Sequence, residues 1–200
     1  MHDTAITMPP SLDDERTQFS RQRFVAMPIA GLMAWLVIGI AGTYLAVDQA
    51  AFILLVVSGM IFPLGLLVAR FTGEDLIGRN RKGNRFDRLF LSTILMSFLV
   101  FGIAIPFIQI DPSSTPLCVG ILTGLMWIPL SWIIQHWIGY VHGICRTLLI
   151  VVAWYLFPAH RFIVIPLIIV VLYLFSIQVL SRRWRSLGLG PIATHRASTT

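Results

Sequence analysis

A short polar segment interrupts the otherwise apolar second half of the sequence, and its side chains are of types that can bind a ligand. It contributes five candidate residues within twelve positions, namely Gln135, His136, Tyr140, His142 and Arg146. The i, i+4 spacing of His142 and Arg146 places both on one face of a helix. An arginine at the centre of a membrane helix costs about 2.5–3.5 kcal/mol on insertion scales, so it usually faces the bundle interior or an aqueous cavity. These residues form a candidate polar pocket for an anionic ligand.

Arg146 has a second interpretation that needs no site. A helical side chain points toward the N-terminus of its helix, and a long cationic side chain near a helix end can snorkel to the lipid headgroups. The two interpretations predict different hydrogen-bond partners for the Arg146 guanidinium. In a pocket, Gln135 and Tyr140 would share hydrogen bonds with the guanidinium, because the short turn at 135–137 holds two helix ends together and an unpaired charge is costly in hydrocarbon.

Other chemical patterns are incomplete, so we expect no catalytic residues, no metal and no cofactor, and therefore no enzyme. A zinc site needs three or four ligands, and His136 and His142 supply only two, on different helix faces. The segment Gly78–Gly83 has the length of a phosphate loop but lacks the Lys followed by Ser or Thr. Ser131 could pair with His136 as a nucleophile, but their spacing puts them on different faces and no oxyanion donors are evident.

The elements that must position these residues are six apolar stretches. With 56% hydrophobic and 12% charged residues, the 200-residue chain is too apolar for an ordinary soluble domain. The stretches are 24–47, 51–69, 89–110, 117–134, 138–157 and 162–180. Each has the roughly 20 residues that about 30 Å of hydrocarbon requires. The sequence predicts an all-α membrane protein, with a mobile polar tail at 1–23, a six-helix transmembrane domain at 24–180, and a basic, mostly disordered tail at 181–200.

The basic residues set an orientation for this bundle. Of 15 Lys and Arg residues, all except Arg161 fall in alternate connections or in the two terminal segments, which leaves 15 − 1 = 14 on one side. Short basic loops are retained in the cytoplasm, so both termini should be cytoplasmic. Eight of these residues are expected to contact anionic lipid rather than nucleic acid: Arg79, Arg81, Lys82, Arg85, Arg88, Arg182, Arg183 and Arg185.

Helix packing has its own sequence signals. Gly120 and Gly124, like Gly139 and Gly143, form GxxxG patterns that let two helix backbones approach closely. The patterns fit a contact inside one protomer, the face of a homodimer or no special role, and all three remain open. Pro129 lies near the middle of its span, where a missing backbone hydrogen bond would kink the helix.

Three segments carry a resemblance to a known family. They are the run from Phe62 to Arg70, the return at Arg85–Phe90, and Pro129-Leu130-Ser131-Trp132 followed by Tyr140. These segments resemble DUF7010, a family of small bacterial multi-pass membrane proteins of unknown function. The resemblance implies a bacterial cytoplasmic (inner) membrane, and it implies no activity and no catalytic residues.

Two functional classes fit the sequence. The favoured one is a small permease or membrane binding protein for an anionic solute or a lipid headgroup. The alternative is a non-catalytic structural or assembly partner of another membrane protein. A carrier needs a polar cavity that reaches the middle of the membrane, whereas a partner needs only a packing surface that faces the lipid.

Overall fold

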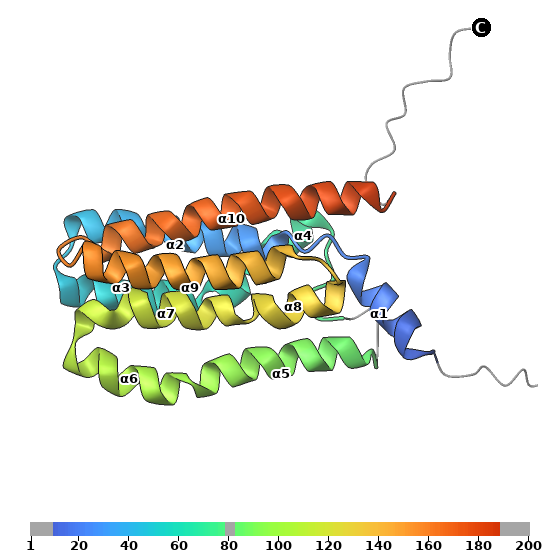
Figure 1. Cartoon of the computed structure of the whole chain (residues 1–200), viewed down its shortest axis with the longest axis horizontal. Coiled ribbons are helices and arrows are strands. Elements are labelled where there is room, and N and C mark those ends of the chain that lie inside the picture. The colour runs from blue at the N-terminus through green and yellow to red at the C-terminus, as the bar shows by residue number, and fades with distance from the viewer. Residues whose placement is uncertain (1–9, 79–82, 189–200) are drawn as a thin grey trace, which may run out of the picture.

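The computed structural model describes residues 10–78 and 83–188, and within these ranges every regular element is helical (Figure 1). In chain order the elements are α1 (Leu12–Ser20), α2 (Ala26–Tyr44), α3 (Val47–Gly59), α4 (Ile61–Thr72), α5 (Arg85–Leu99), α6 (Phe101–Ile110), the 3₁₀ turn η1 (Pro112–Ser114), α7 (Thr115–Leu125), α8 (Trp127–Ile134), α9 (Ile138–Leu156) and α10 (Arg161–Ser186). The all-α prediction is confirmed.

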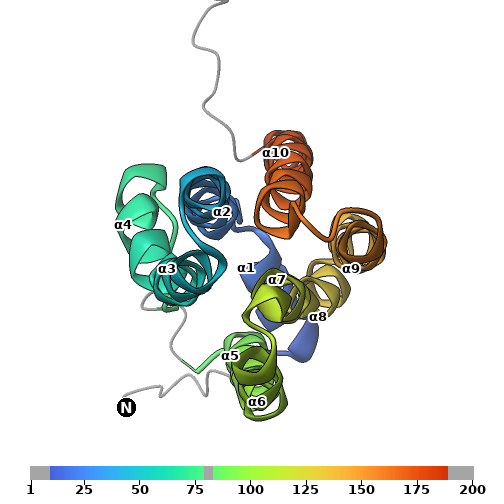
Figure 2. The same ribbon diagram turned by 90° about the vertical axis from the view of Figure 1, so that its left-hand side faces the viewer.

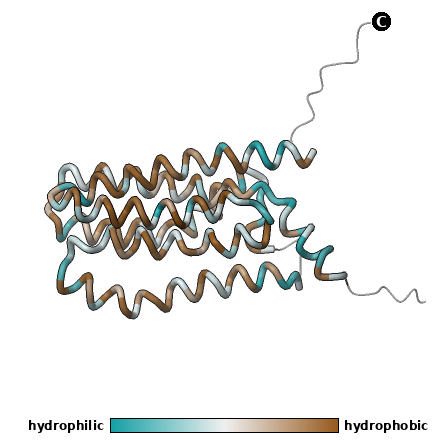
Figure 3. Tube along the Cα trace, viewed as in Figure 1, coloured by the Kyte–Doolittle hydropathy of each residue, from teal (hydrophilic) through white to brown (hydrophobic). Residues whose placement is uncertain are grey.

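Most of these helices are long and apolar enough to cross a membrane. Five runs meet that description: Ala26–Tyr44, Arg85–Ile110, Pro112–Ile134, Ile138–Leu156 and Arg161–Ser186. The helices α3 and α4 meet it only as a pair that is bent by 45°. Within residues 10–78 and 83–188 the count is thus five, or six when the bent pair is one span. These runs consist mainly of apolar residues, and polar residues gather at the end of the bundle that carries α1 (Figure 3).

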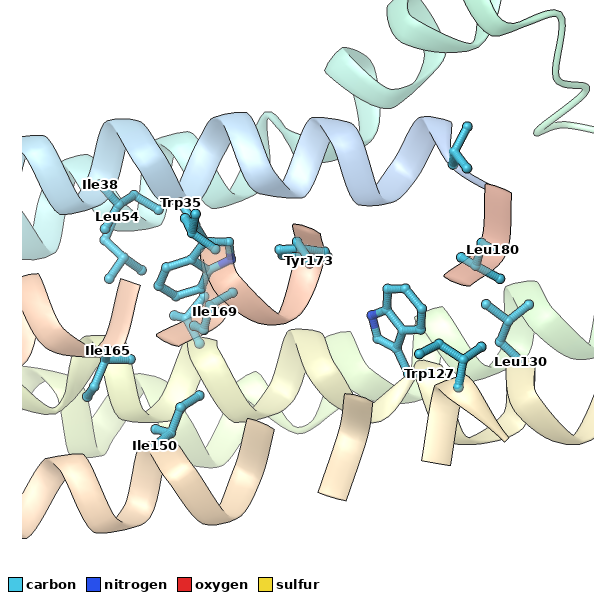
Figure 4. Packing of buried hydrophobic residues seen from close by; sticks show 14 of the residues in the cluster. Trp35, Ile38, Leu54, Trp127, Leu130, Ile150, Ile165, Ile169, Tyr173 and Leu180 are labelled. Carbon is cyan, nitrogen blue, oxygen red and sulfur yellow. The ribbon is translucent and has the colours of Figure 1, made fainter. Parts of the chain in front are cut away.

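The core lies between α2, α7, α9 and α10. Seen along the bundle, these helices surround its centre, and α4 and the α5–α6 run lie on the outside (Figure 2). Large apolar side chains fill the centre (Figure 4), among them Trp35, Ile38, Leu54, Ile165 and Ile169.

Two glycines let α2 and α10 approach closely. A Cβ on Gly42 would overlap the backbone carbonyl of Phe162, and one on Gly31 would lie 2.6 Å from the hydroxyl of Tyr173. Small residues are the usual means of close approach between membrane helices, because lipid tails provide no hydrophobic drive for association. The centre of α10 is therefore held against α2.

The fourth predicted span is broken near its middle. The helix α7 ends at Leu125 and α8 begins at Trp127. Pro129 has no N–H to donate to the carbonyl of Leu125, four residues earlier, and this accounts for the break at Met126.

The two GxxxG patterns face neighbouring helices of the same chain. A Cβ on Gly139 would overlap the carbonyl of Trp127, and a Cβ on Gly143 would lie 3.5 Å from the carbonyl of Gly124. Gly120 faces side chains of α9 and α10. The glycines thus bring α9 against α7 and α8.

The N-terminal segment differs from the mobile tail expected over 1–23. The structure has a helix there, α1, whose first turn is closed by a reciprocal capping box between Ser11 and Asp14. Phe19 on this helix is buried, with its ring 6.2 Å from that of Phe90. The expectation failed because a nine-residue helix with few buried positions has almost no hydrophobic periodicity to detect.

The C-terminal boundary also differs from the expectation. The helix α10 continues to Ser186, although 181–200 was predicted to be a tail. The basic residues at 182–185 remain helical because cations are favoured in the last turn, beside the helix carbonyls. Residues 1–9 and 189–200 lie outside the described part of the chain.

Gly139→Ala should lower the stability of the fold, whereas Gly102→Ala should not. The first adds a methyl group against a backbone carbonyl, and overpacking of this kind typically costs about 1–3 kcal/mol. The second is a matched control, because nothing lies within 4 Å of a Cβ at Gly102. The measurement is the thermal unfolding midpoint of each variant in detergent. Equal midpoints would show that α8 and α9 do not approach as described.

Candidate functional site

Arg146 lies at the centre of the bundle. It is midway along α9, and its side chain is 0% exposed. Trp35 and Tyr173, which are midway along α2 and α10, lie beside it, with ring centroids 5.5 and 5.4 Å from the guanidinium carbon. The guanidinium therefore faces the bundle interior and not the outer surface.

Among the residues that the structure describes, only neutral groups bind the guanidinium. Its Nε donates to the carbonyl of Gly120 at 2.7 Å, and Nη2 donates to Oγ1 of Thr123 at 2.8 Å. Nη1 donates to the hydroxyl of Tyr173 at 3.2 Å and contacts Nε2 of His142 at 3.4 Å. The helices α2, α7, α8, α9 and α10 contain no Asp or Glu. The positive charge has no carboxylate to compensate it on any of these helices.

The hydrogen bonds of His142 define its tautomer. The Ser176 hydroxyl donates its one proton to the carbonyl of Leu172 at 2.8 Å, so it must accept from Nδ1 of His142, also at 2.8 Å. Nδ1 then carries the proton and Nε2 is free to accept from Arg146. The imidazole stacks on Trp127 with ring centroids 4.0 Å apart. His142 is thus a neutral ring fixed by α8 and α10.

The site has more donors than acceptors. The indole Nε1 of Trp35 is buried without a hydrogen-bond partner among the described residues, and it lies on the side of the ring that faces Tyr173 (Figure 4). The hydroxyl of Tyr173 accepts from Arg146 and so keeps its own proton for another acceptor. Unused N–H and O–H donors beside an uncompensated cation are the groups that bind an anion.

The structure brings together only two of the five predicted pocket residues, His142 and Arg146. Gln135 is exposed and ends α8 with a left-handed backbone, φ 50°. His136 stacks on Trp137 and accepts from the backbone N–H of Ile138. Tyr140 is 39% exposed and shares no hydrogen bond with Arg146. The expected sharing is wrong for Tyr140 because Tyr140 precedes His142 by two residues, which places it on nearly the opposite face of α9 from His142 and away from Arg146.

The remaining groups of the site come from helices distant in the sequence. They are Trp35, Gly120, Thr123, Trp127, Tyr173 and Ser176. Tyr173 and Ser176 are polar residues in the middle of an apolar helix, three positions apart on one face. That pattern was the available signal, because polar groups inside membrane helices usually face the bundle interior.

The basic residues predicted to contact lipid have different surroundings. Arg85 is paired with Glu15 at 3.1 Å, and its hydrogen bonds hold the pKa of Glu15 below its usual value. Arg183 donates to the carbonyl of Ser20. Arg85, Arg88, Arg182 and Arg185 are exposed and Arg183 is partly buried, while Arg79, Arg81 and Lys82 lie outside the described residues.

Residues 12–183 match the family described as "Family of unknown function (DUF7010)". The chain belongs to the DUF7010 family. The predicted resemblance is confirmed, and the match also includes α1, which the segments quoted from the sequence did not reach. No curated protein and no solved structure matches this chain.

Arg146→Met should be at least as stable as the wild type, whereas Arg146→Lys should be less stable. Removing a buried, unpaired charge relieves its desolvation cost, and apolar replacements of buried charges are often neutral or stabilising. Lysine keeps the charge but has no planar fork, so it cannot meet all four acceptors and should lose about 1–3 kcal/mol. Thermal unfolding in anion-poor buffer compares the three proteins. A Met variant several degrees less stable than the wild type would mean that Arg146 is retained for stability.

Proposed function

We propose that this chain is a multi-pass membrane protein that binds a small anion at Arg146, as a permease or membrane binding protein. One observation carries the proposal: in the described part of the chain, a fully buried guanidinium in the middle of the bundle is held by neutral acceptors alone. A guanidinium stays charged under all physiological conditions. An arrangement that retains such a charge at a cost to stability is typical of binding sites inside membrane proteins.

The charge of the site favours a singly charged anion. Arg146 is the only charged residue in the interior of these helices, since the others lie close to helix ends. One negative charge compensates that of Arg146. A doubly charged anion must give up more hydration to enter the same apolar surroundings, so the site should disfavour it. Nitrate, chloride and acetate are therefore suitable probes, and sulfate is the unfavourable one.

Isothermal titration of the detergent-purified protein with sodium nitrate, chloride, acetate and sulfate at pH 6 tests the proposal. The wild type should bind at least one singly charged anion with a 1:1 stoichiometry and should bind sulfate at least tenfold more weakly. Arg146→Met should bind none. Arg161→Gln is the matched control, because Arg161 lies at the far end of α10 and is held by Ser113. The absence of binding in the wild type, or binding unchanged in Arg146→Met, would overturn the proposal.

We further propose six spans in a bacterial inner membrane, with both termini in the cytoplasm. The basic asymmetry supports this orientation: Arg16, Arg85 and Arg183 lie at the α1 end, and Arg161 lies at the other end. The exposed Arg88, Arg182 and Arg185 would then face anionic headgroups.

Reporter fusions test this orientation. Alkaline phosphatase, which is active only outside the cytoplasm, should be active when fused after Asp48, Ser113 or His160, because these positions lie in connections with few basic residues. It should be inactive when fused after Arg185 or within 78–84. A fluorescent protein at the same positions is the control, because it reports the cytoplasmic side. Activity within 78–84 would reverse the orientation.

An assembly role is the second candidate, and the α5–α6 run favours it. This run lies at the edge of the bundle (Figure 1), and large apolar side chains on it are strongly exposed, such as Ile103 at 78% and Ile110 at 83%. A partner helix could pack on this face. Under this alternative the wild type binds none of the four anions, and Ile103→Lys prevents assembly with the partner.

A further inference from the structure

The weakest contact of the Arg146 guanidinium is the one with His142. Its distance is 3.4 Å, against 2.7, 2.8 and 3.2 Å for the contacts with Gly120, Thr123 and Tyr173. Hydrogen bonds weaken with distance, so this contact costs least to give up. An incoming anion would most easily take the place of His142 as the acceptor for Nη1.

An anion in that place would face the unprotonated nitrogen of the imidazole, Nε2. Nε2 of His142 faces the guanidinium with a lone pair, because the proton is on Nδ1 and is bound by Ser176. Ser176 cannot reverse the arrangement, since its own proton is donated to Leu172. A lone pair facing an anion is repulsive, and only a proton added at Nε2 turns that side of the ring into a donor.

We propose that the anion binds between Arg146 and His142 together with one proton, which His142 takes up at Nε2. This inference rests on the proposed anion site and adds the coupling of anion binding to proton uptake. The proton comes from water, forms the Nε2–H bond and is donated in a hydrogen bond to the anion, and Nη1 of Arg146 donates to the same anion. The net charge of the site is +1 before and after binding, so the anion enters with no net charge moved into the bundle.

The surrounding groups leave His142 as the site of protonation. Arg146 on its own helix is already charged, and α7 contributes only the hydroxyl of Thr123. On α10 the neighbours are Tyr173 and Ser176, and α8 contributes Trp127. None of these is a base. The indole of Trp35 on α2 is a donor only.

The coupling predicts a pH dependence of anion affinity. Each proton taken up with the anion makes the apparent dissociation constant rise about tenfold per pH unit, and by reciprocity the anion favours protonation. Nitrate is the suitable probe, because it is itself unprotonated between pH 6 and 8. Its dissociation constant should be about 100-fold larger at pH 8 than at pH 6.

The experiment is a nitrate titration of the full-length protein at pH 6, 7 and 8, with proton uptake measured by an indicator dye in weak buffer. The wild type should take up one proton for each nitrate bound. His142→Gln should still bind nitrate, because an amide donates without being protonated, but with no pH dependence and no proton uptake. His136→Gln is the matched control and should behave as the wild type.

The outcomes separate the two proposals. If the wild type binds no nitrate, chloride or acetate even at pH 6, the anion site itself is wrong. If it binds nitrate with the same affinity at all three pH values and without proton uptake, only the coupling is wrong. A wild-type pH dependence that persists in His142→Gln would overturn the role of His142. It would point instead to Glu74, a half-buried carboxyl beyond α4 whose pKa is raised by burial.

Discussion

The uncompensated charge of Arg146 is the constraint on which the centre of the bundle depends. A guanidinium cannot lose its proton, and burying it without a counter-ion costs several kcal/mol. The surrounding helices therefore have to present acceptors at fixed places. Gly120 can do so because a helix carbonyl keeps a second lone pair after its helical hydrogen bond. Thr123 donates to the carbonyl of Val119, which leaves its oxygen free to accept from Arg146.

The same constraint explains the small residues around the site. Gly124 leaves room for the arginine side chain, since a Cβ there would lie 2.9 Å from Cδ of Arg146. Gly31 leaves room for Tyr173 in the same way. These glycines would weaken a helix in water by about 1 kcal/mol each relative to alanine. Here they let the helices approach closely enough to bring acceptors within reach of the guanidinium. The close packing around the site and the hydrogen bonds of Arg146 thus depend on the same glycines.

The sequence was most informative where a single helix carried the signal. The spacing of His142 and Arg146 predicted their common face, and the apolar runs predicted the all-α fold. What the sequence could not supply was the pairing of distant helices, so Tyr173, Ser176 and Thr123 were missed. Tyr140 was misplaced because proximity along the chain was taken for proximity in space. The short helix α1 was missed because its stability comes from contacts such as Asn84 with the carbonyl of Glu15, which no local pattern reveals.

Access to the buried site depends on which end of the bundle can open. At the α1 end, the carbonyls that end α8 are bound by two cations: Arg16 donates to Trp132 and Ile133, and Arg183 donates to Ile134. These hydrogen bonds connect α1 and α10 to α8, and α8 and α10 are the helices that flank His142. At the other end, a Cβ on Gly42 would overlap the backbone carbonyl of Phe162, and Arg161 donates to the hydroxyl of Ser113 beside a hollow that both residues line. Water can replace such hydrogen bonds as they break, whereas separating the apolar contacts in the middle of the bundle exposes surface with no compensation. The two ends, where arginine side chains hold the connections, are therefore less costly to open than the apolar middle.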